Sequence, residues 1–221
     1  MENQYKQPIC TNFVNYLHHL CASERPTHAC SAYFCHPVET SFNADLHQEI
    51  VENLGAASHE VDGCDPYTEN FNPGLSRSER LGFHDVPSNR MPVQRCVDRL
   101  QWAEALVFCF PTWCFVMPAM LKGFFERVLM PGEAFDISAP QNVKPALTNI
   151  KRISAVVTYG RPSWTALLMG YPPRKSITRN LKLLKGGRAS ATYHALHHMN
   201  VATPEILTRF KSRLGCAMLR F

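Results

Sequence analysis

The stretch EALVFCFPTWCFVMPAMLKGFFERVLM, residues 104–130, contains a buried strand, a loop and an amphipathic helix in succession. Residues 105–110 form a continuous apolar run, which is typical of a parallel strand covered on both faces. Pro111 has no backbone N–H to donate to a sheet, so we expect the strand to end there. Pro118 suits the first turn of a helix, and apolar side chains follow it at helical spacing. These spaced positions are Leu121, Phe124, Phe125, Val128 and Leu129.

Apolar strands alternate with helical segments along the rest of the chain. We expect strands at 29–35, 59–62, 105–110, 153–157 and 192–197, and helices at 42–55, 93–102, 118–130, 175–184 and 204–218. Gly55 is expected to cap the first of these helices and Thr203 to start the last. The alternation predicts an α/β fold with a doubly wound, parallel, five-stranded sheet in the order 2-1-3-4-5. We interpret residues 1–28 as an N-terminal extension with a short helix, and 29–221 as the domain.

Composition excludes several classes of protein. The 221 residues are 45% hydrophobic and 19% charged, which is typical of a globular domain. No long apolar run occurs in the first thirty residues, so we expect neither a secretory signal nor a membrane span. The nine cysteines are scattered and form no C-x-x-C pair, so we expect no metal site. Reduced thiols indicate a cytoplasmic protein.

Charge is distributed unevenly along the chain. The formal net charge is +5, but residues 165–221 carry ten Lys and Arg against a single acid, Glu205. This basic third could attract an anionic cofactor or substrate, or it could be a solvated helix face. We find no nucleic-acid-binding motif and expect no nucleic-acid partner.

Three loops at the carboxyl ends of strands carry polar or aromatic residues: 36–43, 111–117 and 158–164. In the predicted strand order these loops meet at one edge of the sheet, where ligands bind. Hydroxyl and amide groups in the first loop lie beside the free N–H groups of a helix N-terminus, a geometry that binds phosphate but also serves ordinary capping. The other two loops offer aromatic surfaces and backbone donors to a planar ring. Together they favour a flavin mononucleotide moiety over a sugar or a peptide.

Three motifs resemble the flavodoxin-like NAD(P)H:quinone oxidoreductase family. They are HPVETSFN at 36–43, FPTWCFVMPAMLKGFFERV at 110–128 and VTYG at 157–160. The resemblance implies a flavodoxin-like fold, a bound flavin, and a homodimer with active sites at the subunit interface. The long C-terminal section favours FAD over FMN. The resemblance also implies ping-pong chemistry, in which NAD(P)H as co-substrate gives a hydride to the flavin and a quinone-like small molecule then takes two electrons.

The resemblance also implies roles for individual residues. The phosphate and ribityl part of the cofactor would be held by His36, Thr40, Ser41, Phe42 and Asn43. The isoalloxazine would lie against Pro111, Thr112, Trp113, Cys114 and Phe115. Its polar edge would accept or donate hydrogen bonds at Thr158, Tyr159 and Gly160. The candidate catalytic and substrate-pocket residues are Tyr159, Phe135, Trp164 and Tyr171.

The second motif departs from the family pattern. The family loop reads W-W-Y-G-M-P or Q-W-F-G-V-P, whereas this chain has Val116 at the glycine and Cys114 at an aromatic position. A β-branched residue resists positive φ, so the loop must differ here if the family glycine uses that conformation. Cys114 is either a small filler or a reactive thiol. Two functions therefore remain open: an oxidoreductase, and a flavin- or nucleotide-sensing regulatory protein with weak or no turnover. The net basic charge disfavours a one-electron carrier.

Overall fold

The structure is a computed structural model that describes residues 27–138, 141, 143–184 and 190–221. Its sheet has five parallel strands in the order β2-β1-β3-β6-β7. Their bounds are β1 Ala29–Phe34, β2 Glu60–Cys64, β3 Ala105–Pro111, β6 Arg152–Thr158 and β7 Ser190–Leu196. The predicted α/β class and the order 2-1-3-4-5 are thereby confirmed. The short helix expected before residue 27 lies outside the described residues.

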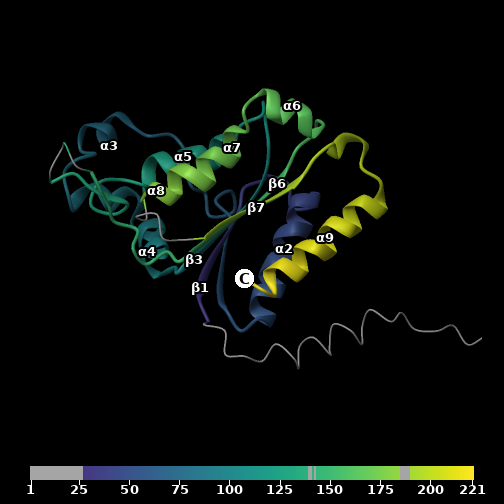
Figure 1. The fold of residues 1–221 in the computed structure, drawn as a ribbon. Helices are drawn as coiled ribbons and strands as arrows, with labels where there is room; N and C mark the ends of the chain where they lie inside the picture. The colour runs from purple at the N-terminus through teal and green to yellow at the C-terminus, as the bar shows by residue number, and fades with distance from the viewer. Residues whose placement is uncertain (1–26, 139–140, 142, 185–189) are drawn as a thin grey trace, which may run out of the picture.

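Helices cover both faces of the sheet (Figure 1). One face carries α2 (Phe42–Ala56) and α9 (Pro204–Met218), with Leu46, Ile50 and Leu214 buried against it. The opposite face carries α4 (Gln94–Trp102) and α5 (Ala119–Val128). Every residue of β3 is buried, as expected for the central strand of a doubly wound sheet.

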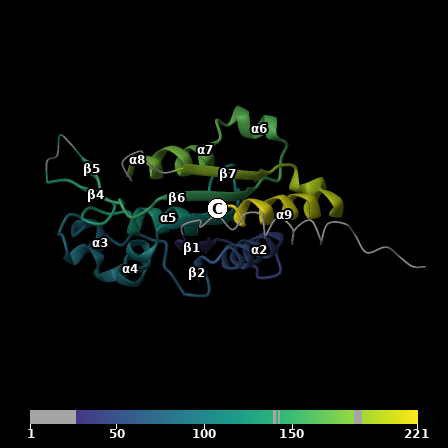
Figure 2. The same cartoon turned by 60° about the horizontal axis from the view of Figure 1, so that its bottom comes forward.

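Shorter elements complete the fold, and several of them are labelled in Figure 2. After β6 the described chain forms short helices before it reaches β7. They are α6 (Ser163–Leu168), α7 (Pro172–Lys175), η2 (Ser176–Leu181) and α8 (Lys182–Leu184). The remaining ones are α3 (Arg77–Leu81), η1 (Ser88–Val93), β4 (Phe135–Asp136), β5 (Lys144–Pro145) and η3 (Met199–Val201). The helix predicted at 175–184 is thus two short α-helices joined by a π-helix, and α6 begins inside the segment predicted as a loop.

Two predicted boundaries are wrong for identifiable reasons. Pro111 belongs to β3 and pairs with Thr158, because pairing with β1 has already stopped at Cys109 and the missing N–H is not needed. Gly55 lies inside α2, whose cap residue is Ala57. The left-handed conformation after this helix falls on Ser58, with φ of 66°. By contrast, α9 begins directly after Thr203, as predicted.

The long segment between β2 and α4 is held against α5 by hydrogen bonds and close packing. The Arg127 guanidinium, only 8% exposed as a residue, donates to the Glu79 carboxylate at 2.8 Å and to the carbonyl of Asn72. Gly123 permits this approach, because a Cβ at that position would overlap the backbone of Pro73. This segment lies mostly at the surface and contains a capped helix, α3, while these contacts hold it to α5.

Two properties of the described residues bear on the sequence predictions. No described helix has both the length and the apolar content required to span a membrane. The cysteines in the described part of the chain are all free: Cys30, Cys35, Cys64, Cys96, Cys109, Cys114 and Cys216.

Candidate functional site

The three predicted loops meet around Thr158, at the carboxyl end of β6. The Thr158 hydroxyl accepts a hydrogen bond from Asn43 Nδ2 at 3.0 Å. Its carbonyl accepts from the backbone N–H of Thr112 at 2.8 Å and from the Thr112 hydroxyl at 3.2 Å. Thr158 and Asn43 are 4% and 5% exposed, so these bonds lie inside the protein. The two side chains thereby join the first and third loops.

The loop at 36–43 presents donors at the start of α2. Ser41 caps the helix by accepting from Ala44 N–H at 3.3 Å, which leaves its own hydroxyl hydrogen free to donate. Within the described chain no hydrogen bond is formed by the backbone N–H groups of Thr40, Phe42 and Asn43. Free N–H groups at a helix N-terminus attract a phosphate. Thr40 is exposed and adds a hydroxyl to the same loop.

The loop after β3 is a tight turn. Trp113 and Val116 exchange two backbone hydrogen bonds of 3.1 and 3.0 Å. The two residues between them, Cys114 and Phe115, have φ of 50° and 64°, which is the type I′ pattern. Val116 is not among the positive-φ residues of the structure, so the left-handed positions fall elsewhere in the turn. The Trp113 ring is 41% exposed and its centroid lies 6.0 Å from that of the His36 ring, so the first two loops contact each other.

The loop after β6 contains a buried tyrosine beside an open glycine. Tyr159 is 2% exposed, its hydroxyl lies 2.6 Å from the Tyr193 hydroxyl, and its N–H donates to the Leu196 carbonyl at 2.8 Å. Burial raises the pKa of Tyr159, so the phenol stays neutral. Gly160 is different, because its N–H forms no hydrogen bond within the described residues. A Cβ at Gly160 would lie 3.0 Å from the Asn200 amide oxygen.

The structure brings together only some of the candidate substrate-pocket residues. The Tyr171 ring lies 6.3 Å from that of Tyr159, and its hydroxyl donates to the Ser163 carbonyl at 3.1 Å. Trp164, on α6 directly after the third loop, is 61% exposed. Phe135 lies in β4, at the end of the sheet to which α5 returns, and so is apart from the three loops within one chain (Figure 2).

Sequence reasoning missed a fourth contributor, the segment that follows β7. His197 stacks on Tyr159 with ring centroids 4.7 Å apart, and its Nε2 is buried without a hydrogen-bond partner among the described residues. Burial lowers the pKa of His197, which favours the neutral ring. The Met199 N–H donates to the Tyr159 carbonyl at 2.9 Å. This segment follows the carboxyl end of a strand, so the rule that identified the other loops applies to it as well.

The assembled groups fit a planar ring with an anionic tail. Free N–H groups and hydroxyls cluster at one helix N-terminus, while an exposed indole and the open N–H of Gly160 lie on the adjoining loops. A parallel sheet with ligand-binding loops at its carboxyl edge defines the doubly wound class of α/β proteins. A family model described as the flavodoxin-like fold matches residues 33–185, more than half of the chain. The chain therefore belongs to the flavodoxin-like fold family.

Curated relatives confirm the resemblance given by the three motifs. NAD(P)H dehydrogenase [quinone] 1 of Rattus norvegicus is 32% identical over 148 residues, covering 60% of this chain and 54% of that protein. The ribosyldihydronicotinamide dehydrogenase [quinone] of the same species is 32% identical over 123 residues, covering 47% and 52%. The chain thus spans about half the length of the curated relatives it matches.

Solved structures confirm the fold. An NAD(P)H:quinone oxidoreductase from Methanothermobacter marburgensis superposes with a TM-score of 0.73 at 22% identity, covering 88% of this chain and 98% of that one. An FMN-dependent NADH-azoreductase from Bacillus anthracis, in complex with FMN, gives 0.69 at 12% identity, covering 87% and 98%.

Proposed function

We propose that this chain is a flavin-dependent NAD(P)H:quinone oxidoreductase whose site is the set of loops joined at Thr158. The observation that carries the proposal is the convergence of unbonded helix N-terminal donors, an exposed indole and an open glycine N–H at one edge of the sheet. Names of the curated relatives support the reaction class. When bound, the flavin would receive a hydride from NAD(P)H and pass two electrons to a quinone-like acceptor in ping-pong order.

The residues of this chain would bind and orient the cofactor. Thr40, Ser41 and the N–H groups at the start of α2 would hold its phosphate. Trp113 would lie against the ring, and the Gly160 N–H would donate to its polar edge. Tyr159 would act as a positioning residue, because its hydroxyl is already bonded to that of Tyr193 and its ring stacks on His197. We expect these residues to exclude water from one side of the ring, which strengthens every hydrogen bond made there.

Three finer features belong to the same proposal. The cofactor is FAD in our proposal, with FMN as the alternative, since an FMN complex occurs among proteins of this fold. The protein acts as a homodimer with active sites at the subunit interface. The exposed apolar side chains of α6, which are Trp164, Leu167 and Leu168, lie beside the site and suit such an interface or an apolar acceptor.

Spectroscopy and turnover test this function directly. Protein produced with ample riboflavin should be yellow, and mass analysis of the released cofactor should identify FAD or FMN. NADPH and NADH oxidation with menadione should give parallel double-reciprocal lines, as expected of ping-pong transfer. Thr40→Ala should weaken flavin binding by on the order of tenfold, whereas Thr208→Ala, an exposed threonine on α9, should not.

The outcomes separate the two functions. Bound flavin without quinone-dependent oxidation would support the sensing protein, which the substitutions at Cys114 and Val116 first raised. Colourless protein that also fails to bind added flavin would refute the oxidoreductase and the flavin-sensing function and leave only the fold.

A further inference from the structure

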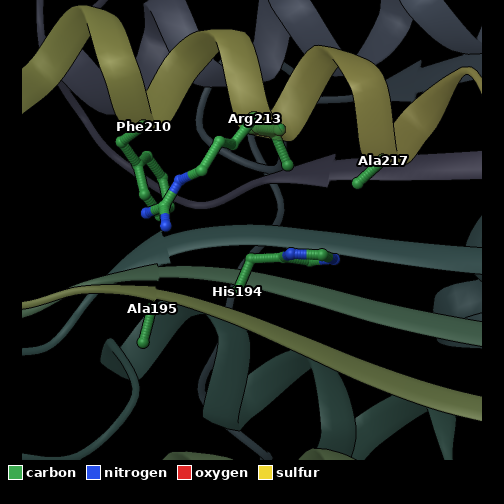
Figure 3. Close-up of a pocket in the computed structure, with 6 residues that line it drawn as sticks. His194, Ala195, Phe210, Arg213 and Ala217 are labelled. Carbon is green, nitrogen blue, oxygen red and sulfur yellow. The ribbon is translucent and has the colours of Figure 1, made fainter.

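A hollow lies between β7 and α9, beside the edge strand of the sheet (Figure 3). Its volume is about 340 Å³. His194 pairs with Val156, two residues before the end of the strand, so the hollow is distinct from the loops around Thr158. The residues that line it are His194, Ala195, Phe210, Arg213, Leu214 and Ala217.

The two polar side chains of the hollow are those of His194, which is half-buried, and Arg213, which is exposed; neither forms a hydrogen bond or ion pair in the described part of the chain. His194 is half-buried and forms no hydrogen bond there, although its ring offers one donor and one acceptor when neutral. Burial and the charge of Arg213 both lower the pKa of His194, so the neutral ring is favoured. The Arg213 guanidinium lies over the Phe210 ring, 5.9 Å from its centroid, and forms no ion pair with a described acid. Figure 3 shows both side chains directed into the space between the helix and the strand.

The helix beside the hollow carries an excess of positive charge. On α9 the only acid is Glu205, in the first turn, while Arg209, Lys211 and Arg213 follow along the helix. Lys211 pairs with Glu49 of α2 at 3.6 Å, which leaves Arg213 as the cation facing the hollow. Arg213 is exposed, so an anion can reach its guanidinium from solvent, and the apolar side of the hollow strengthens the attraction.

We propose that this hollow binds a small planar organic anion, namely an aromatic carboxylate of one or two rings. The guanidinium of Arg213 supplies a planar fork that matches a carboxylate in two parallel hydrogen bonds. The His194 ring supplies a further donor, and Leu214 and Ala217 supply an apolar wall for the ring. The volume lies at the small end of ligand pockets, which admits such an acid and excludes a dinucleotide. Binding here requires no flavin.

Calorimetric titration with 1-naphthoate tests the site, with 1-naphthamide as the neutral probe of the same shape. We expect 1-naphthoate to bind with a Kd below 1 mM and the amide to bind about tenfold more weakly, because it cannot pair with the guanidinium as an ion. Arg213→Gln should weaken naphthoate binding by about tenfold or more. Arg213→Lys should bind naphthoate with an affinity between those of the wild type and Arg213→Gln, since lysine keeps the charge but cannot form two parallel hydrogen bonds to a carboxylate.

Arg209→Gln is the matched control. Arg209 is exposed on the same helix and does not line the hollow, so its loss changes net charge equally and should leave the Kd within about twofold. His194→Phe should weaken binding while keeping the volume filled.

Each of the following results would overturn the assignment: no naphthoate binding, equal binding of the amide, or equal effects of Arg213→Gln and Arg209→Gln. Displacement of naphthoate by FAD would also overturn it, because the acid would then occupy the flavin site. Circular dichroism of each variant establishes that the fold persists.

Discussion

Removing the hydroxyl of Thr158 should uncouple the loops of the proposed site. In Thr158→Val the buried amide of Asn43 loses an acceptor at 3.0 Å and a donor at 3.4 Å. Leaving a buried polar group without its partner costs about 1–3 kcal/mol of unfolding free energy. For a chain of this size each kcal/mol lowers Tm by about 2–4 °C. Flavin affinity should fall as well, because the first and third loops are no longer fixed to each other.

A double-mutant cycle measures this pair directly. Urea unfolding of Asn43→Ala, Thr158→Val and the double variant should give a coupling of about 1 kcal/mol, since either single change already breaks the bond. Thr158→Ser keeps the hydroxyl and should retain most of the stability. Thr208→Val, an exposed control on α9, should change stability by less than about 0.5 kcal/mol. Single-variant effects that add to within about 0.3 kcal/mol would refute the reasoning.

Three further predictions concern stability, each measured by urea unfolding. Gly123→Ala should destabilise by about 3 kcal/mol or more, because the new methyl meets backbone of Pro73 that cannot move aside; an unchanged midpoint would contradict this packing. Ser41→Ala should cost about 1 kcal/mol through loss of the cap of α2, and Ser41→Asn should restore most of it. Burial lowers the pKa of His59, whose Nδ1 accepts from the N–H of His28. The stabilisation by neutral His59 is therefore complete above the pKa of the unfolded state, about 6.5, and is lost as pH falls toward the lower pKa of the folded state. Between pH 7.5 and 5, His59→Gln should accordingly lose less stability than the wild type.

The position of each loop could be predicted from the sequence because strand and loop signals are local. The apolar run at 105–110, the proline at 111 and the helical spacing after Pro118 identify the central strand and its helix. The ordering of parallel strands then places their carboxyl ends at one edge. Boundaries were less accurate, and Pro111 shows why: its tolerance in the strand depends on where a neighbouring strand stops.

The roles of individual side chains within the loops could not be predicted from the sequence, because they depend on tertiary contacts. Tyr159 and Asn43 carry polar groups that suggest ligand binding when only the sequence is considered. In the fold both are buried, and their bonds run to Tyr193 and Thr158, residues 34 and 115 positions away. Phe135 likewise joins the candidates on chemical grounds, and the return of α5 along the sheet carries it to the other end.

The sequence by itself determined the strand order, the loops at its carboxyl edge and the family, because hydrophobic periodicity and short motifs reflect interactions among near neighbours. Only the tertiary structure decided which polar groups are free, that the left-handed residues of the turn are Cys114 and Phe115, and that Arg213 faces a hollow beside His194. Those properties depend on partners distant in sequence, and satisfaction of a buried hydrogen bond is decided only when both partners are in place.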